Sequence, residues 1–242
     1  MKNRVLDLVS VANALPVSQF KLSKLILQLR DSHSIRTDLS LAYDFTGSLS
    51  VIREQAVVAG AGSLAENSFY ALFQSALLLY VRATKTDSKH RASFDFRKDY
   101  DTEEKRKHKM LCDLRDEAIA HYGPGGVSNG PALQDDGVFL VQTETLGGQV
   151  FTASRRAVIA HSLIADLTQM AHRALMLSDK RTQLLNEKVV EKINAALMYD
   201  PSLGPIFGAS AMDFADWVGG DQAAQDVLDG DRVGYRRGNA HH

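Results

Sequence analysis

The residues best suited to chemistry are Arg115, Asp116 and His121, within the run Leu-Arg-Asp-Glu-Ala-Ile-Ala-His-Tyr-Gly-Pro at positions 114–124. Cleaving an RNA phosphodiester without a metal ion needs a base for the 2′-hydroxyl, an acid for the leaving 5′-oxygen and a cation for the phosphate. His121 can act as base or acid near neutral pH. Arg115 can bind a phosphate through two parallel hydrogen bonds, and Asp116 can orient either group.

The spacing of these residues resembles a known motif. Five residues separate Arg115 from His121, and a Gly-Pro pair follows shortly after the histidine. This pattern resembles the Arg-x(4–6)-His motif of the HEPN superfamily, all-α domains that act mostly as RNA-cutting modules in defence and toxin–antitoxin systems. Arg115 matches the arginine, Asp116 stands where the family often has Asn, Asp or His, and His121 matches the histidine. The gap is one residue longer than in the commonest version.

The resemblance covers roughly residues 50–200 and implies a fold, a reaction and partners. It implies an all-α helical bundle of HEPN type, with a small β-hairpin after the motif helix. It implies a metal-independent endoribonuclease with Arg115, Asp116 and His121 as catalytic residues, RNA as substrate, and an antitoxin or regulatory protein as a further partner. A Tyr-x-Tyr element found in some members is absent, since only Tyr122 follows the histidine. Regulation by tyrosine nucleotidylation is therefore not expected.

On a single ideal helix, Arg115 and His121 do not lie side by side. At about 100° per residue, Arg115 and His121 lie about 120° apart around an ideal helix. Either the last helical turn loosens or a second motif completes the site. The resemblance implies a homodimer whose motifs face each other.

A structural alternative uses the same residues without catalysis. Arg115 then pairs with a carboxylate, and His121 is a helix C-terminal histidine that the helix dipole stabilises. The corresponding function is a non-catalytic helical dimer that binds a partner protein or a nucleotide.

A basic run, Lys-Arg-Lys-His-Lys at positions 105–109, precedes the motif. Lys105, Lys107 and Lys109 are candidates for binding an RNA backbone; the alternative is the solvated face of a helix. Phe94, Phe96 and Tyr100 lie nearby and can stack on bases, or anchor the loop in the core.

Most of the chain shows helical patterns. We expect helices over 21–29, over 51–85 (single, or two joined near Gly60), over 101–122, over 155–177 and over 185–197. Residues 31–50 are ambiguous, and residues 64–81 are apolar nearly all round, which is typical of a central helix. Short β-prone runs at 138–141 and 149–152 predict a hairpin. We divide the chain into an N-terminal helical extension (1–50), a HEPN-like domain (51–200) and a partly ordered acidic tail (201–242).

The composition sets limits on the class of protein. The chain has 242 residues, 45% of them hydrophobic and 24% charged, with a formal net charge of −1. These values exclude collagen-like and largely disordered chains, and nucleic acid could bind only through a local basic patch. The single cysteine, Cys112, excludes an intramolecular disulfide and is predicted to be a packed thiol. Asp7 interrupts the first apolar stretch, so we expect no signal peptide. We further expect a cytoplasmic protein without membrane contact, and we expect neither a metal site nor a cofactor.

Overall fold

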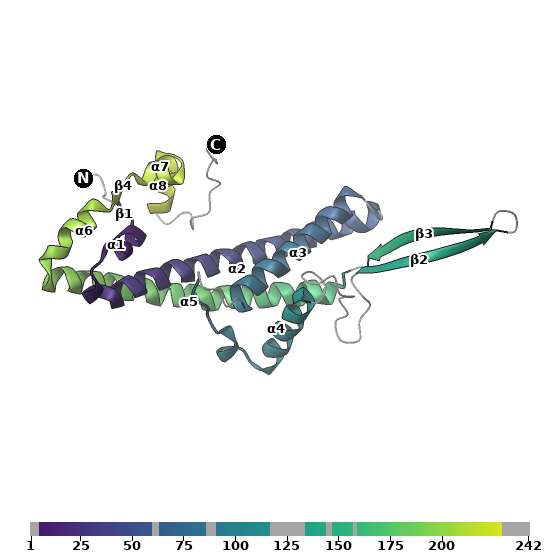
Figure 1. The fold of residues 1–242 in the computed structure, drawn as a ribbon, viewed down its shortest axis with the longest axis horizontal. Helices are drawn as coiled ribbons and strands as arrows, with labels where there is room; N and C mark the ends of the chain where they lie inside the picture. Colours follow the sequence, from purple (N-terminus) through teal and green to yellow (C-terminus); the bar gives the residue numbers. More distant parts are fainter. Residues whose placement is uncertain are drawn as a thin grey trace. The chain divides into compact units, whose positions relative to one another are not determined.

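Two helices of 40 and 39 residues, α2 (Phe20–Ala59) and α5 (His161–Tyr199), are the longest elements of the chain (Figure 1). The computed structural model describes residues 5–59, 63–85, 91–116, 134–143, 147–156 and 159–228. Within these residues helix dominates, which confirms the all-α class. Strands form two antiparallel pairs, β1 (Val5–Leu6) with β4 (Ala211–Met212), and β2 (Gln134–Thr143) with β3 (Gly147–Arg156).

The chain divides into two compact units, and their boundaries differ from those of the three segments expected from the sequence. The first comprises residues 1–37 and 180–242, and the second residues 38–179. The helices α2 and α5 each contribute residues to both units.

The first unit has an apolar core between elements from the two ends of the chain. Buried Val11 of α1 (Leu8–Ala14) packs with Leu203 and Phe207, and Ala12 packs with Ile26 and other apolar residues of α2 and α5. Its other elements are the 3₁₀ turns Val17–Gln19 and Pro201–Leu203 and helices α6 (Gly204–Ala209), α7 (Phe214–Val218) and α8 (Asp221–Leu228).

The aromatic residues of the C-terminal tail differ in burial. Phe207 is buried, whereas Trp217 is 72% exposed and stacks on Phe214 with ring centroids 6.0 Å apart. The described part of the tail reaches Leu228.

The second unit holds the site. It contains α3 (Leu64–Lys85), a 3₁₀ turn (Phe96–Lys98), α4 (Thr102–Leu114) and the β2–β3 hairpin. Polar contacts join its helices in pairs: Arg82 of α3 with Asp38 of α2, and Lys107 of α4 with Asp166 of α5. Tyr80 of α3 also contacts His108 of α4.

Several expected boundaries change. The ambiguous residues 31–50 are helical and join the predicted helices on either side into α2, and the two helices predicted at 155–177 and 185–197 form one helix, α5. The expected start of a helix at Arg155 is wrong, because Arg155 and Arg156 belong to β3 and Arg155 is the cross-strand partner of Asp135. The joint near Gly60 lies outside the described residues.

The central helix is less uniformly buried than its composition indicates. Phe73, Leu77 and Tyr80 of α3 are buried, whereas Leu64 is 84% exposed and Leu78 is 40% exposed. No helix in the described part of the chain is long and apolar enough to span a membrane.

Candidate functional site

Helix α4 begins with a strong N-terminal cap, and the predicted motif starts at the C-terminal end of this helix. The amide N–H of Glu104 donates to Asp101 Oδ1 (2.8 Å), and the amide N–H of Asp101 donates to Glu104 Oε2 (3.0 Å). This reciprocal capping box satisfies two donors that the first turn leaves unpaired. Glu104 also pairs with Arg173 of α5 at 3.0 Å, so the start of α4 is fixed to a second helix.

The end of α4 places Arg115 beside Asp116. Arg115 Nη1 donates to Asp116 Oδ1 at 2.6 Å, and both side chains are 33% exposed. Arg115 Nε is buried and has no hydrogen-bond partner among the described residues. At these two residues the helix widens from α to π geometry, a feature that is frequent at functional sites.

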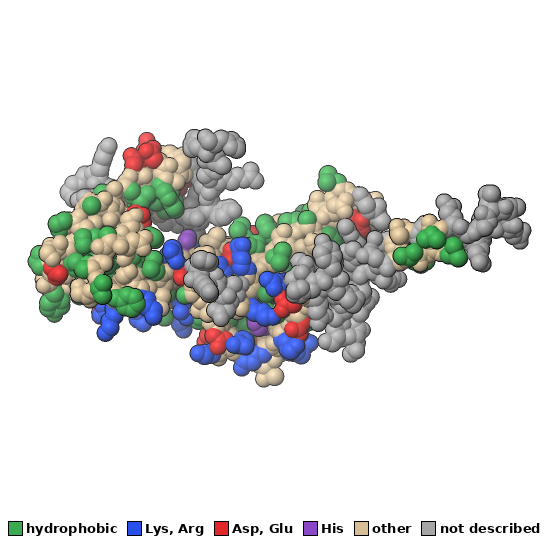
Figure 2. Space-filling model, viewed as in Figure 1, with side chains coloured by type: hydrophobic (Ala, Val, Ile, Leu, Met, Phe, Trp, Pro, Cys, Tyr) green, Lys and Arg blue, Asp and Glu red, His purple; other side chains and the backbone are tan. Residues whose placement is uncertain are grey.

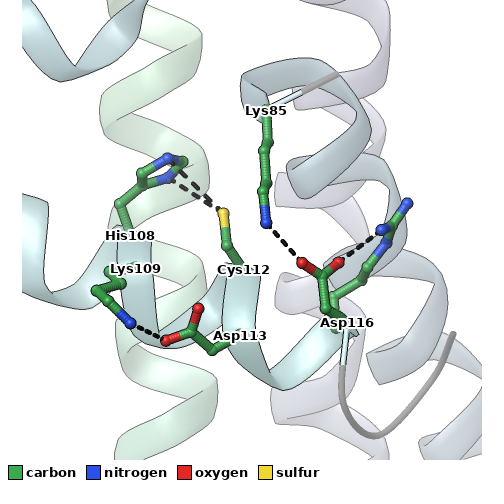
Figure 3. A network of polar contacts seen from close by, with 7 residues as sticks. Lys85, His108, Lys109, Cys112, Asp113 and Asp116 are labelled. Atoms are coloured by element: carbon green, nitrogen blue, oxygen red, sulfur yellow. Dashed lines mark hydrogen bonds and ion pairs between the residues drawn. The ribbon is translucent and has the colours of Figure 1, made fainter. Parts of the chain in front are cut away.

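A third charged residue, Lys85 at the end of α3, completes this cluster. Lys85 Nζ donates to the other carboxylate oxygen of Asp116 at 2.5 Å (Figure 3). The hydrogen bond from Lys85 lowers the pKa of Asp116, with a smaller contribution from Arg115, and the same bond raises the pKa of Lys85. Asp116 is therefore an ionised carboxylate held between two cations.

A pocket of about 980 Å³ adjoins the cluster. Its walls come from the end of α3, the segment 93–98 and one face of α4, and Lys85 lines it. Five cationic and two acidic side chains belong to the lining: Lys85, Arg97, Lys98, Lys105, Lys109, Asp95 and Asp113. Figure 2 shows lysine and arginine side chains, with some acidic ones among them, gathered over α4 and the turn that precedes it.

The predicted basic run is divided between two faces of α4. Lys105 and Lys109 line the pocket, but Lys107 does not. Lys107 is directed to α5, where its Nζ contacts Asp166 Oδ1 and Gln169 Oε1, each at 2.7 Å. Positions four apart share a helix face and positions two apart do not, so Lys107 lies apart from Lys105 and Lys109. That these three lysines bind an RNA backbone stays a prediction.

A buried polar group adjoins the pocket, since His108 and Cys112 belong to the lining. Tyr80 Oη lies 2.9 Å from His108 Nδ1, and Cys112 Sγ lies 3.7 Å from His108 Nε2. Burial lowers the pKa of His108 and raises the pKa of Cys112 to about 11. The thiol is therefore protonated at neutral pH, which confirms the packed cysteine predicted from the sequence.

The three aromatic residues before α4 have different positions. Phe96 and Tyr100 are buried and anchor the segment in the core. Phe94 is half-buried, lines the pocket and packs edge-on against Phe96 with ring centroids 4.2 Å apart.

Of the three predicted catalytic residues, the structure thus brings Arg115 and Asp116 together, and His121 lies outside the described residues. Lys85 and Lys98 were not among the residues predicted from the sequence. Lys85 lies 31 positions before Asp116, so no local spacing indicates their contact.

A comparison of the chain with protein-family models finds no match, and comparisons with curated proteins and with solved structures also find none.

Proposed function

We propose that the chain is a metal-independent endoribonuclease of HEPN type that acts as a homodimer, in a defence or toxin–antitoxin setting. The observation that carries this proposal is the Arg115–Asp116 pair in the π-helical turn at the end of α4, which Lys85 holds beside a basic pocket. Both side chains are one-third exposed, so a substrate phosphate can reach them.

Each motif residue has a distinct task in the proposed reaction. Arg115 stabilises the negative charge that develops on the phosphate. Asp116 positions the guanidinium, because it accepts a hydrogen bond from Arg115 Nη1 and is itself held by Lys85. His121 acts either as the base that removes the proton of the 2′-hydroxyl or as the acid that donates a proton to the leaving 5′-oxygen. With one such histidine per motif, a homodimer supplies one group for each proton.

The test is cleavage of single-stranded RNA by the purified chain without added metal, together with its oligomeric state by light scattering. We expect cleavage by the wild type and a loss of at least about a hundredfold in His121→Ala, as is typical when an acid–base residue is removed. Arg115→Lys keeps the charge but loses the paired hydrogen bonds, and should lose activity too. His33→Ala, at an exposed position outside the site, is the matched control. Cleavage by His121→Ala at the rate of this control would refute the proposal.

A second candidate is a non-catalytic helical dimer that binds a partner protein or a nucleotide. The observation that favours it is that the Arg115 guanidinium is already paired with Asp116. Expression in cells separates the two candidates. A nuclease is toxic when expressed alone, and Arg115→Ala or His121→Ala relieves the toxicity; a binding module is harmless in all three forms.

A further inference from the structure

The pocket beside α4 has an excess of positive charge that its own acidic residues do not neutralise. Asp95 Oδ1 accepts from Arg97 Nε at 3.1 Å, and Asp113 pairs with Lys109. Lys85 pairs with Asp116.

The remaining cations of the lining are Lys98 and Lys105. Both are exposed, and neither forms an ion pair with any residue that the structure describes. They come from two different elements of the lining, the 3₁₀ turn and the first part of α4. Two unpaired ammonium groups at one pocket are suited to bind phosphate oxygens.

The same pocket offers apolar surface next to these charges. Phe94 forms part of the wall, and His108, neutral through the burial that lowers its pKa, lines the pocket with Cys112. An aromatic side chain beside cationic ones is the combination by which proteins bind single-stranded nucleic acids: bases stack on the ring and phosphates contact the cations. The volume of about 980 Å³ lies in the range of pockets that hold drug-sized ligands, and is large enough for a nucleotide.

We infer that this pocket binds one nucleotide unit of a single-stranded RNA, with the base against Phe94 and the adjoining phosphates at Lys98 and Lys105. Because Lys85 both lines the pocket and contacts Asp116, a strand seated there continues toward Arg115. The choice of an RNA strand rests on the proposed function; the nucleotide chemistry of the pocket rests on its lining.

The first experiment measures binding of a short fluorescent 2′-O-methylated oligouridine by anisotropy at several salt concentrations. The 2′-O-methyl group removes the hydroxyl that cleavage needs, so binding is measured without catalysis. The variant K98Q/K105Q is compared with K21Q/K24Q, which changes the charge equally at exposed positions of α2 outside the pocket. Each lost phosphate contact should reduce the salt slope by about 0.7, so between about 50 and 200 mM salt the control should lose about sevenfold more affinity than K98Q/K105Q. Equal affinities and slopes for the two variants would overturn the inference.

The second experiment tests the base. Phe94→Leu keeps an apolar side chain but removes the ring, and should weaken oligouridine binding about tenfold while leaving an abasic oligomer of the same length unaffected. Wild-type protein that binds the abasic oligomer as tightly as oligouridine would overturn the placement of the base.

A third experiment, a competition assay, distinguishes an RNA strand from a free nucleotide as the ligand of the pocket. Uridine 5′-monophosphate should compete at least about a hundredfold less well than the oligomer, because it offers a single phosphate. Equal competition would assign the pocket to free nucleotides and overturn its assignment to RNA. If wild-type protein fails to cleave unmodified RNA while K98Q/K105Q still differs from its control in binding, the nuclease proposal falls and the pocket assignment stands. If wild-type protein cleaves RNA while K98Q/K105Q binds like its control, the pocket assignment falls and the nuclease proposal stands.

Discussion

Removing the Asp38 carboxylate should strongly destabilise the second unit, because this buried acid joins two arginines that are separate in the chain. Its side chain is only 7% exposed and accepts from Arg82 Nε at 2.9 Å and from Arg91 Nη1 at 2.7 Å. Arg91 Nη2 also donates to the carbonyl oxygen of Arg82 at 2.6 Å. Asp38 therefore ties α2, the end of α3 and the segment that begins at Arg91 to one another.

The size of the effect follows from the exposure of the two arginines. Arg82 is 56% exposed, so water can solvate it again, and its share stays within the roughly 1 kcal/mol of a surface ion pair. Arg91 is 16% exposed and would lose its ion pair with Asp38, for which we take about 2 kcal/mol, below the roughly 3–5 kcal/mol of a fully buried pair. Asp38→Ala should thus lower the free energy of unfolding by about 3 kcal/mol, and Tm by about 6–12 °C. Asp38→Asn, which keeps one acceptor oxygen, should cost about half as much.

Urea unfolding followed by helical circular dichroism measures this change, with Asp44→Ala on the exposed face of α2 as the matched control. A shift in midpoint with an unchanged slope would report a change of stability alone. A difference of less than about 0.5 kcal/mol between Asp38→Ala and the control, which is the usual range for surface substitutions, would refute the reasoning.

Two further predictions follow from the pKa shifts. The pKa of Asp116 is lowered in the folded chain, so its pairing contributes stability above the unfolded pKa, near 4, and that contribution is lost as the pH falls through the folded pKa. The urea midpoints of wild type and Asp116→Asn should therefore converge on acidification from about pH 5 to pH 3, and a constant gap would contradict the Lys85–Asp116 contact. Burial raises the pKa of Cys112 to about 11, so at pH 8 a disulfide reagent should label the native thiol about a hundredfold more slowly than the urea-unfolded chain. Equal labelling rates would show that Cys112 is not packed.

The sequence predicted the helices that have an apolar stripe but missed their continuity. Residues 31–50 are rich in serine, threonine and aspartate, which favour turns when only local propensity is considered. In the structure Thr37 and Ser48 donate to backbone carbonyls four residues earlier, so their hydroxyl groups are satisfied within the helix. Leu39 and Leu49 are fully buried, and this packing outweighs the weak local preference.

Tertiary contacts also account for the fusion of the two helices predicted at 155–177 and 185–197. The polar residues between their apolar stripes suggest a break. Ser178 is nonetheless buried, and the hydroxyl of Thr182 lies 2.9 Å from that of Ser32 on α2. Polar residues with long-range partners can lie inside a packed helix, and a single sequence gives no sign of such partners.

The hairpin shows the opposite case, in which local pattern was sufficient. The β-prone runs lie within β2 and β3, although both strands are longer than expected and Gly147 and Gly148 belong to β3. Val138 and Val150 are 73% and 64% exposed. Strand propensity and cross-strand pairing, rather than burial of these side chains, account for the prediction.

At the candidate site, the sequence predicted which residues form the motif but not the contacts that position their side chains. The estimate of about 120° between Arg115 and His121 assumes a uniform α-helix. The helix has π rather than α geometry at Arg115 and Asp116, and His121 lies outside the described residues. The position of Asp116 is set by Lys85, from a helix that ends 31 positions earlier in the chain, and Asp116 in turn holds the guanidinium. The orientation of Arg115 is therefore a property of α3 and α4 together, and a motif defined by spacing along one helix contains only half of the groups that determine it.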